Sequence, residues 1–203
     1  MGKIIYLTGA PATGKSTLTR NLAEKADQVM VFTYSKELAR IVSSRVGAID
    51  QKDLREQSAK LITRDDVEAV DAELVQLAQR FKNQNGFLII DSHPVTIESF
   101  GFRVTPFTKE MLRQLAPDVI TCLYADAHTL ANRIQADAAG RPLPTKTELE
   151  RHVDLQCNLA SVYAFETGAS LYYLDAARAE GELLENFMQV SRIPRSIYSD
   201  SGS

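Results

Sequence analysis

The chain has 203 residues, a length that favours one compact domain over two. Hydrophobic residues make up 44% of the sequence and charged residues 24%, which excludes collagen-like, low-complexity and disordered classes. The net charge of −3 gives no sign of a nucleic-acid or anionic-membrane partner, and nothing indicates the oligomeric state. Because no apolar run approaches the length of about 18 residues that a membrane span needs, we expect a cytoplasmic protein.

Strand and helix patterns alternate along the chain. Short apolar or β-branched runs predict strands at residues 4–8, 29–32, 87–91, 119–124 and 171–174. Apolar residues at helical spacing predict helices at residues 16–27, 36–46, 63–82, 108–115, 129–138, 148–167 and 182–189, the third opening with a capping box of Thr63 and Asp66. Because helices separate the strands, we expect an α/β fold, a three-layer α/β/α sandwich around a central, mostly five-stranded parallel sheet.

Three segments carry weaker patterns. Residues 47–61 mix charges with few apolar side chains, which indicates a solvated loop and a short helix. Residues 139–146 contain Gly140, Pro142 and Pro144 and are predicted to form a loop. The end of the chain has too little apolar content to pack, so we expect one domain at residues 1–190 and a flexible tail at residues 191–203.

A glycine-rich motif lies between the first predicted strand and the first predicted helix. It reads Gly9-Ala10-Pro11-Ala12-Thr13-Gly14-Lys15-Ser16 and matches G-x-x-x-x-G-K-[ST]. Its glycines let backbone N–H groups surround a phosphate at a helix N-terminus, and Lys15 would neutralise the β- and γ-phosphates. The Ser16 hydroxyl suits Mg²⁺, and Thr17 is placed to donate to the α-phosphate. The motif predicts a P-loop fold that binds ATP and Mg²⁺.

Asp91 ends the apolar run at residues 87–91. A carboxylate there can hold Mg²⁺ through water across from the phosphate loop, although an aspartate after a strand can also be a turn or N-cap residue. His93 follows and has two open interpretations, a contact to the phosphoryl acceptor or attacking water, and a structural histidine.

The other histidines and the cysteines have no motif around them. His128 and His152 fall in or near predicted helices without metal-ligand spacing, so we interpret them as surface or structural residues. Cys122 and Cys157 are too few for a disulfide framework, which fits a reducing interior. We expect both cysteines to be buried and inert.

Taken together, these residues resemble the adenylate kinases, most closely the archaeal-type branch, with a looser likeness to the eukaryotic nuclear isoenzyme 6. The likeness runs along most of the chain, through the phosphate loop, Asp91-Ser92-His93, Ala116-Pro117-Asp118-Val119-Ile120 and Thr167-Gly168-Ala169. It implies a nucleoside monophosphate kinase fold with a short lid at about residues 139–147. By the same resemblance, Arg133 and Arg141 are lid arginines, which would close over the triphosphate and exclude water.

The resemblance also suggests residues on the acceptor side. Arg55 resembles an arginine that the family places near the monophosphate, and Thr33 to Lys36 occupies the usual start of the acceptor helix. The chain departs from the family at Gln156-Cys157, where the family has Asn-Arg after its Glu-Glu-His helix. One phosphate-contacting arginine is therefore missing, which leaves the acceptor in question.

Three functions follow as expectations. The first is Mg²⁺-dependent transfer of the γ-phosphoryl group of ATP to a nucleoside monophosphate, with AMP as the expected acceptor and Lys15, Asp91, Arg133 and Arg141 as catalytic residues. The second keeps the fold but phosphorylates another small molecule or a polynucleotide end. The third is an ATP-driven switch or assembly factor that hydrolyses ATP slowly through Asp91 and His93.

Overall fold

The computed structural model describes residues 1–47, 61–137 and 142–197. Its main sheet is formed by β1 (Lys3–Gly9), β2 (Val29–Thr33), β3 (Phe87–Asp91), β6 (Val119–Tyr124) and β7 (Ser170–Asp175). These five strands are parallel and lie in the order β2-β3-β1-β6-β7, with β1 in the middle. The predicted parallel sheet of five strands is confirmed.

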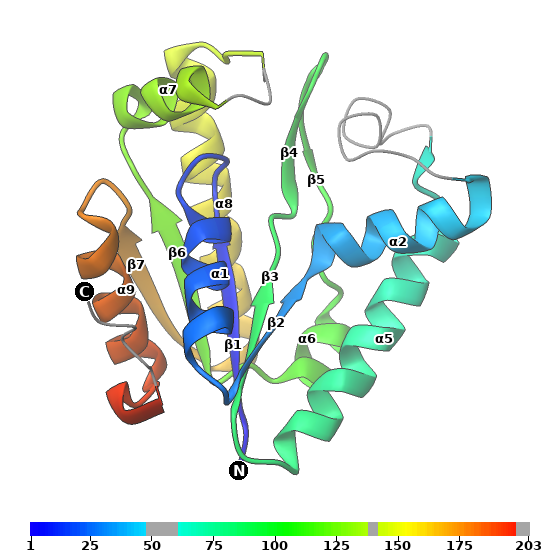
Figure 1. Ribbon diagram of the computed structural model, residues 1–203. Coiled ribbons are helices and arrows are strands. Elements are labelled where there is room, and N and C mark those ends of the chain that lie inside the picture. The colour runs from blue at the N-terminus through cyan, green and yellow to red at the C-terminus, as the bar shows by residue number, and fades with distance from the viewer. Residues whose placement is uncertain (48–60, 138–141, 198–203) are drawn as a thin grey trace.

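Helices cover both faces of this sheet (Figure 1). They are α1 (Lys15–Lys25), α2 (Tyr34–Val46), α5 (Arg64–Lys82), α6 (Lys109–Leu115), α7 (Ala127–Ala136), α8 (Lys146–Thr167) and α9 (Glu180–Ser191). Helices α1 and α9 pack on one face, and α5, α6 and α8 pack on the other. The predicted three-layer sandwich is therefore confirmed.

The central strand β1 shows why two cores form. Its side chains alternate between the faces of the sheet, so Ile5 and Leu7 join the core under α1 and α9. Ile4 and Tyr6 point the other way, into the core under α5, α6 and α8. All four side chains are buried, as expected of a strand with a helical layer on each side.

The helix ends follow the local sequence. At the start of α5, the Thr63 hydroxyl accepts from the Asp66 N–H while the Asp66 carboxylate accepts from the Thr63 N–H, which confirms the predicted capping box. At the end of α8, Gly168 adopts φ +71°, a left-handed conformation that glycine reaches at little cost.

A two-stranded antiparallel hairpin, β4 (Val95–Glu98) and β5 (Gly101–Val104), was not expected from the sequence. It follows β3 directly and stands beside the main sheet (Figure 1). Its first strand packs against α8, where Val95 is fully buried. The hairpin therefore adds a wall beside the edge of the sheet where β3 ends.

The expected flexible tail needs correction over residues 191–197. Ser191 ends α9 and is buried, and the Ile193 N–H donates to the Met188 carbonyl at 2.9 Å. Ile193 is buried and Ile197, at the end of a short 3-10 helix, packs on the same core. The segment has few apolar residues, but two of them, isoleucines four residues apart, supply enough apolar surface for it to pack. Residues 198–203 of the predicted tail lie outside the described part of the chain.

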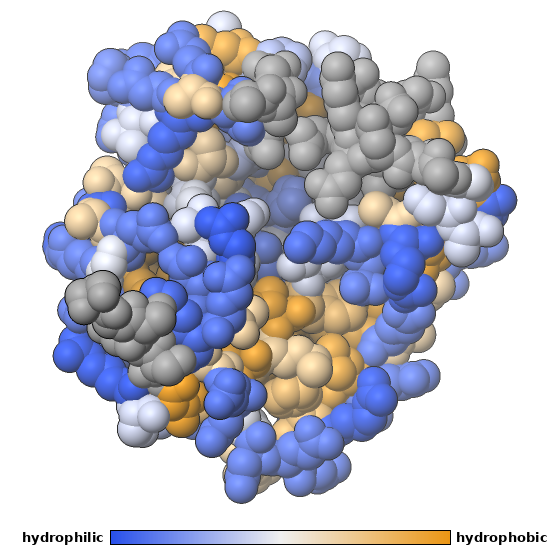
Figure 2. Space-filling view, viewed as in Figure 1, coloured by the Kyte–Doolittle hydropathy of each residue, from blue (hydrophilic) through white to orange (hydrophobic). Residues whose placement is uncertain are grey.

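The surface agrees with this layering. Figure 2 shows mainly polar side chains over the helices, and apolar side chains near β2 between α1 and α5. Strand β2 lies at one end of the sheet order, and its Met30 is 45% exposed. Among the described residues, no helix combines the length and apolar character that crossing a membrane requires.

Candidate functional site

The glycine-rich motif forms a closed loop between β1 and α1. Gly9 leaves β1 with φ +152°, and a Cβ atom there would lie 2.6 Å from the Leu123 carbonyl oxygen, so only glycine fits. The Thr13 hydroxyl donates to the Ala10 carbonyl at 2.8 Å and holds the turn together. Gly14 caps α1 with φ +85° and has no side chain to occupy the helix N-terminus. The first N–H groups of α1 are thus left for an anionic ligand.

Lys15 folds back over this loop. Its ammonium group donates to the Gly9 carbonyl at 2.7 Å and to the Ala10 carbonyl at 3.4 Å, and the side chain is 9% exposed. A cation is thereby placed over the loop rather than in solvent. The remaining motif residues are more open, with Pro11, Ala12 and Thr17 half-buried and Ser16 exposed. The residues of the motif therefore lie around one loop at the N-terminus of α1.

Asp91 reaches the same end of the sheet from the neighbouring strand. In the parallel register it pairs with Leu7 on one side and with Thr33 on the other. Its side chain is 5% exposed, and within the described chain its buried Oδ1 atom has no hydrogen-bond partner. Burial raises the pKa of this carboxyl, and the nearby charges of Lys15 and Lys36 oppose that shift.

The buried, unpartnered oxygen of Asp91 fits a magnesium site. Leaving such an atom without a partner is costly, so it implies a ligand that completes the site. Mg²⁺ is usually held by one or two protein oxygens, several waters and the phosphates of the nucleotide, so a dense acidic cluster is not required. The described residues contain no group of three or more histidine, cysteine or acidic side chains placed for a metal. The donors that fit Mg²⁺ are the Asp91 carboxylate and the Ser16 hydroxyl.

The predicted acceptor-side residues lie around Asp91, with one exception. Thr33 is its register partner on β2, and Lys36 stands in the first turn of α2, close enough for its charge to act on the Asp91 carboxyl. His93 follows two residues after Asp91 and is exposed. Arg55 lies outside the described residues.

Arg133 contacts the phosphate loop from α7. Its guanidinium donates to the Ala12 carbonyl at 3.3 Å and to the Ala176 carbonyl at 2.7 Å. Ala12 is a motif residue with φ +64°, and Ala176 lies in the turn between β7 and α9. One charged side chain thus ties the phosphate loop to a second loop at the same edge. Arg141, the other predicted lid arginine, and residues 138–140 lie outside the described part of the chain.

His152 was interpreted as a surface or structural residue, and the structure excludes the surface location. It is 1% exposed on α8, and its Nε2 atom lies 3.0 Å from the Val95 carbonyl oxygen. Burial lowers the pKa of His152 to about 4, with the Lys15 charge acting in the same direction. The ring is therefore neutral near pH 7, donates from Nε2, and leaves Nδ1 as an acceptor that has no partner in the described chain.

Gln156 lies one turn further along α8 and meets the loop directly. Its amide donates to the Gly9 carbonyl at 3.4 Å, and its buried Oε1 atom is unpartnered among the described residues. The spacing of four residues places His152 and Gln156 on the buried stripe of α8 with Leu149, Ala160 and Tyr163. Two large polar side chains on an otherwise apolar helix face are the signal that could have revealed this wall of the site.

Cys157 contacts a second cysteine. Its sulfur lies 3.5 Å from the sulfur of Cys122 on β6, and it is half-buried whereas Cys122 is fully buried. The expected burial is confirmed for Cys122 and corrected for Cys157, which is only half-buried. The family resemblance implies an arginine at position 157. This chain has Cys157 there, and its thiol contacts that of Cys122.

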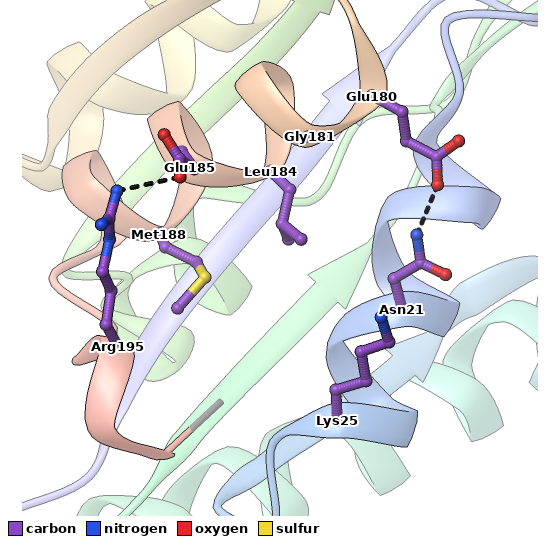
Figure 3. A pocket seen from close by; sticks show the side chains of 8 residues that line it. All are labelled: Asn21, Lys25, Glu180, Gly181, Leu184, Glu185, Met188 and Arg195. Atoms are coloured by element: carbon purple, nitrogen blue, oxygen red, sulfur yellow. Dashed lines mark hydrogen bonds and ion pairs between the residues drawn. The ribbon is translucent and has the colours of Figure 1, made fainter. Parts of the chain in front are cut away.

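A hollow of about 410 Å³ lies elsewhere, between α1 and α9 (Figure 3). Leu184 and Met188 form its apolar floor. Its polar groups already satisfy one another, because Asn21 donates to Glu180 and Arg195 pairs with Glu185 at 3.0 Å. No residue of the glycine-rich motif lines it, so the chemistry predicted from the sequence belongs to the phosphate loop.

A protein-family model described as AAA domain matches residues 8–150. An adenylate kinase of Thermococcus onnurineus is 22% identical over 179 residues, covering 88% of this chain and 88% of the relative. An adenylate kinase of Pyrobaculum aerophilum is 25% identical over 193 residues, covering 95% of this chain and 87% of the relative. These archaeal relatives confirm the resemblance stated from the sequence.

Solved structures of similar shape include two named as kinases. The shikimate kinase of Bacteroides thetaiotaomicron superposes with a TM-score of 0.57 at 14% identity, covering 94% of this chain and 99% of that one. A sugar kinase of Janibacter superposes with a TM-score of 0.55 at 14% identity, covering 98% and 99%. At such identities these structures establish the fold, and the fold is that of the P-loop kinases.

Proposed function

The chain belongs to the AAA-domain family, and from this premise we propose that it transfers the γ-phosphoryl group of Mg·ATP to AMP. It is a phosphotransferase of the P-loop kinase class, as its relatives indicate. The observation that carries the proposal is the meeting of Lys15 and the buried Asp91 at one edge of the sheet, where the charge of Lys15 acts on the Asp91 carboxyl.

The phosphate loop binds the triphosphate. Backbone N–H groups of residues 9–14, apart from Pro11, and of the start of α1 surround the phosphates, and Thr17 donates to the α-phosphate. Lys15 leaves the Gly9 and Ala10 carbonyls when phosphate oxygens replace them, and it then balances charge on the β- and γ-phosphates. Transfer depends on positioning and charge stabilisation, which these groups supply.

Ser16, directly, and Asp91, through water, would hold Mg²⁺. When bound, the ion would supply positive charge against the charge that develops between the β- and γ-phosphates. The Asp91 carboxylate must be ionised for this role, and the charges of Lys15 and Lys36 favour its ionised form. Its Oδ1 atom, unpartnered among the described residues, would accept a hydrogen bond from water held with the ion.

The two arginines act at different points. Arg133 positions the loop through the carbonyls of Ala12 and Ala176 and brings a positive charge to the edge of the phosphate loop. Arg141, carried by the predicted lid at residues 139–147, supplies donors to the equatorial oxygens of the γ-phosphoryl group once the acceptor is bound.

AMP as the acceptor is supported by the curated relatives named adenylate kinase, which match this chain along most of both lengths. The acceptor phosphate would bind among Thr33, Lys36, Arg55 and His93, near Asp91. Lys36 provides the positive charge that a phosphate dianion requires there.

A second candidate keeps the phosphate loop but changes the acceptor. It is favoured by Gln156 and Cys157, because neither offers the charge of the arginine that the resemblance expects. A neutral wall at this position is better matched to a small molecule whose hydroxyl receives the phosphoryl group than to a second phosphate.

An acceptor panel tests both candidates. Purified protein is incubated with Mg·ATP alone and then with AMP, CMP, UMP, GMP, shikimate and gluconate, and ADP formation is followed against a Lys15→Ala variant. We expect AMP to stimulate ADP formation most. Stimulation by a hydroxyl acceptor and not by AMP would establish the second candidate. Equal rates in all mixtures would indicate an ATPase and contradict both.

A further inference from the structure

Two thiols meet beneath the phosphate loop. Cys122 extends from β6 and Cys157 from α8, and their sulfur atoms lie 3.5 Å apart. A disulfide bond needs about 2.0 Å between the sulfurs. The pair therefore requires an approach of about 1.5 Å, which is small for side chains on a strand and the helix packed against it.

The two sulfurs differ in reactivity and access. The hydrogen bond from the Cys122 thiol lowers the pKa of Cys157, whereas the same contact and burial raise the pKa of Cys122. Cys157 is half-buried and Cys122 is fully buried. Cys157 is thus the thiol that a small oxidant meets first, and Cys122 is a second thiol held beside it.

Both cysteines are next to residues of the phosphate loop. Cys122 pairs in register with Thr8, which immediately precedes Gly9. Cys157 follows Gln156, whose amide donates to the Gly9 carbonyl at 3.4 Å. A covalent link between the cysteines would therefore join α8 to β6 at the level where the loop begins.

We propose that Cys122 and Cys157 form a reversible disulfide that weakens nucleotide binding at the phosphate loop. The Cys157 thiolate attacks one oxygen of hydrogen peroxide, the O–O bond breaks, and the departing hydroxide is released as water. The resulting sulfenic acid is attacked by the Cys122 sulfur, the S–O bond breaks, and the hydroxyl leaves as water with the thiol proton. The two thiols lose two electrons, which the peroxide gains.

The effect on the loop follows from its tight fit. Closing the sulfur gap shifts α8 against β6 and moves Gln156 relative to Gly9. Gly9 lies close against β6, since a Cβ added to it would be 2.6 Å from the Leu123 carbonyl oxygen of that strand, so we expect it to stay with β6. The hydrogen bond from Gln156 to the Gly9 carbonyl is already long at 3.4 Å, so this movement would break it. We expect its loss to weaken ATP binding about tenfold.

This inference rests on the proposed binding of ATP at the loop and not on the choice of acceptor. The experiment therefore measures ATP affinity by calorimetry with no acceptor present, for protein treated with hydrogen peroxide and for reduced protein. Peptide mapping under non-reducing conditions identifies the linked pair directly. We expect the linked peptide, an ATP affinity about tenfold lower, and recovery with dithiothreitol, which does not reverse methionine oxidation.

Two variants give matched controls, Cys157→Ser without the first thiol and Cys122→Ala without the second. After peroxide treatment followed by dithiothreitol, both variants should bind ATP as tightly as the untreated, reduced protein does. Cys157→Ser should also do so after peroxide alone. The proposal is overturned by peroxide treatment that yields no linked peptide, by a linked peptide with unchanged ATP affinity, or by an equal loss in Cys157→Ser. If the reduced protein binds no ATP, the proposed function fails, while peptide mapping still decides whether the disulfide forms.

Discussion

The ammonium group of Lys15 lies close enough to the carboxyl of Asp91 for its charge to oppose the rise in pKa that burial causes. The two residues come from different segments, one after β1 and the other at the end of β3, and parallel pairing of these strands brings them to one edge. The same ammonium group donates to the Gly9 and Ala10 carbonyls of the phosphate loop. The opposite charges that phosphate and metal binding require therefore lie at one edge of the sheet.

Asp91→Asn separates a metal-binding role from a structural one. We expect kcat to fall at least about a hundredfold, because the amide does not hold metal-bound water as a carboxylate does. The free energy of unfolding should stay the same or rise, since the change removes a buried charge that has an unpartnered oxygen. Rates across a magnesium series and urea denaturation measure the two effects.

Asp118→Asn is the matched control for this change. Asp118 also stands beside a strand of the main sheet, but at the opposite edge, where its carboxylate accepts from the Ile4 N–H at 2.7 Å. This variant should lose stability by about 1 kcal/mol and keep its rate. If Asp91→Asn behaved in the same way, Asp91 would be a structural residue.

Arg133→Ala should weaken catalysis because the loop loses its tie to the turn after β7. Each charged hydrogen bond to a carbonyl contributes roughly 1.5–3 kcal/mol, so kcat/KM should fall about 10- to 100-fold. Arg133→Lys should recover little, since an ammonium group lacks the fork that reaches two acceptors. Arg178→Ala, which removes an exposed pair with Glu182, should change neither rate nor stability by a measurable amount. Equal effects of the two alanine changes would contradict the role of Arg133.

His152 gives the protein a predictable acid sensitivity. Its pKa in the folded state is about 4 against about 6.5 when unfolded, so the unfolded chain binds more protons between these values. Stability contributed by the neutral ring is present above about pH 6.5 and is lost as pH falls, by about 2 kcal/mol between pH 7 and pH 5.

His152→Gln is the comparison, because its amide can donate to the Val95 carbonyl and does not titrate. Urea denaturation at pH 7 and pH 5 should show a smaller loss in this variant than in the wild type by about that amount. Identical losses would mean that the histidine is protonated in the folded state, contrary to its burial.

Gly9→Ala tests the fit of the phosphate loop. The added methyl group would lie 2.6 Å from the Leu123 carbonyl in a left-handed backbone, so we expect unfolding to become easier by more than about 2 kcal/mol and ATP binding to be lost. Gly181→Ala, in α9 with open space around the position, should be neutral or stabilising by up to about 1 kcal/mol. Thermal denaturation with and without Mg·ATP compares them. A Gly9→Ala protein as stable as wild type would contradict the account.

The sequence was most informative where one local pattern determines one element. The parallel strands, Gly168 at the end of α8 and the Thr63 capping box could all be predicted, because periodicity and cap residues are local signals. The hairpin of β4 and β5 could not, because its short strands gain their stability from packing against α8. The sequence of two such short strands does not indicate that they pack against α8.

The site divides in the same way. The loop motif and Asp91 are visible in the sequence, since one is contiguous and the other ends an apolar run. Gln156 reaches Gly9, and His152 reaches Val95 of the hairpin, only because α8 packs against β1 and β4, and that packing depends on tertiary structure. The contact of Cys122 with Cys157 likewise joins residues 35 positions apart and depends on how α8 packs on β6.

The fate of the γ-phosphoryl group tests the central claim most directly. Protein is incubated with AMP, Mg²⁺ and ATP labelled with ³²P at the γ position, and products are separated by chromatography. We expect label in ADP, with two ADP formed for each ATP consumed, and no labelled ADP with Lys15→Ala. Label released as inorganic phosphate at a rate that AMP does not change would contradict transfer and identify an ATPase.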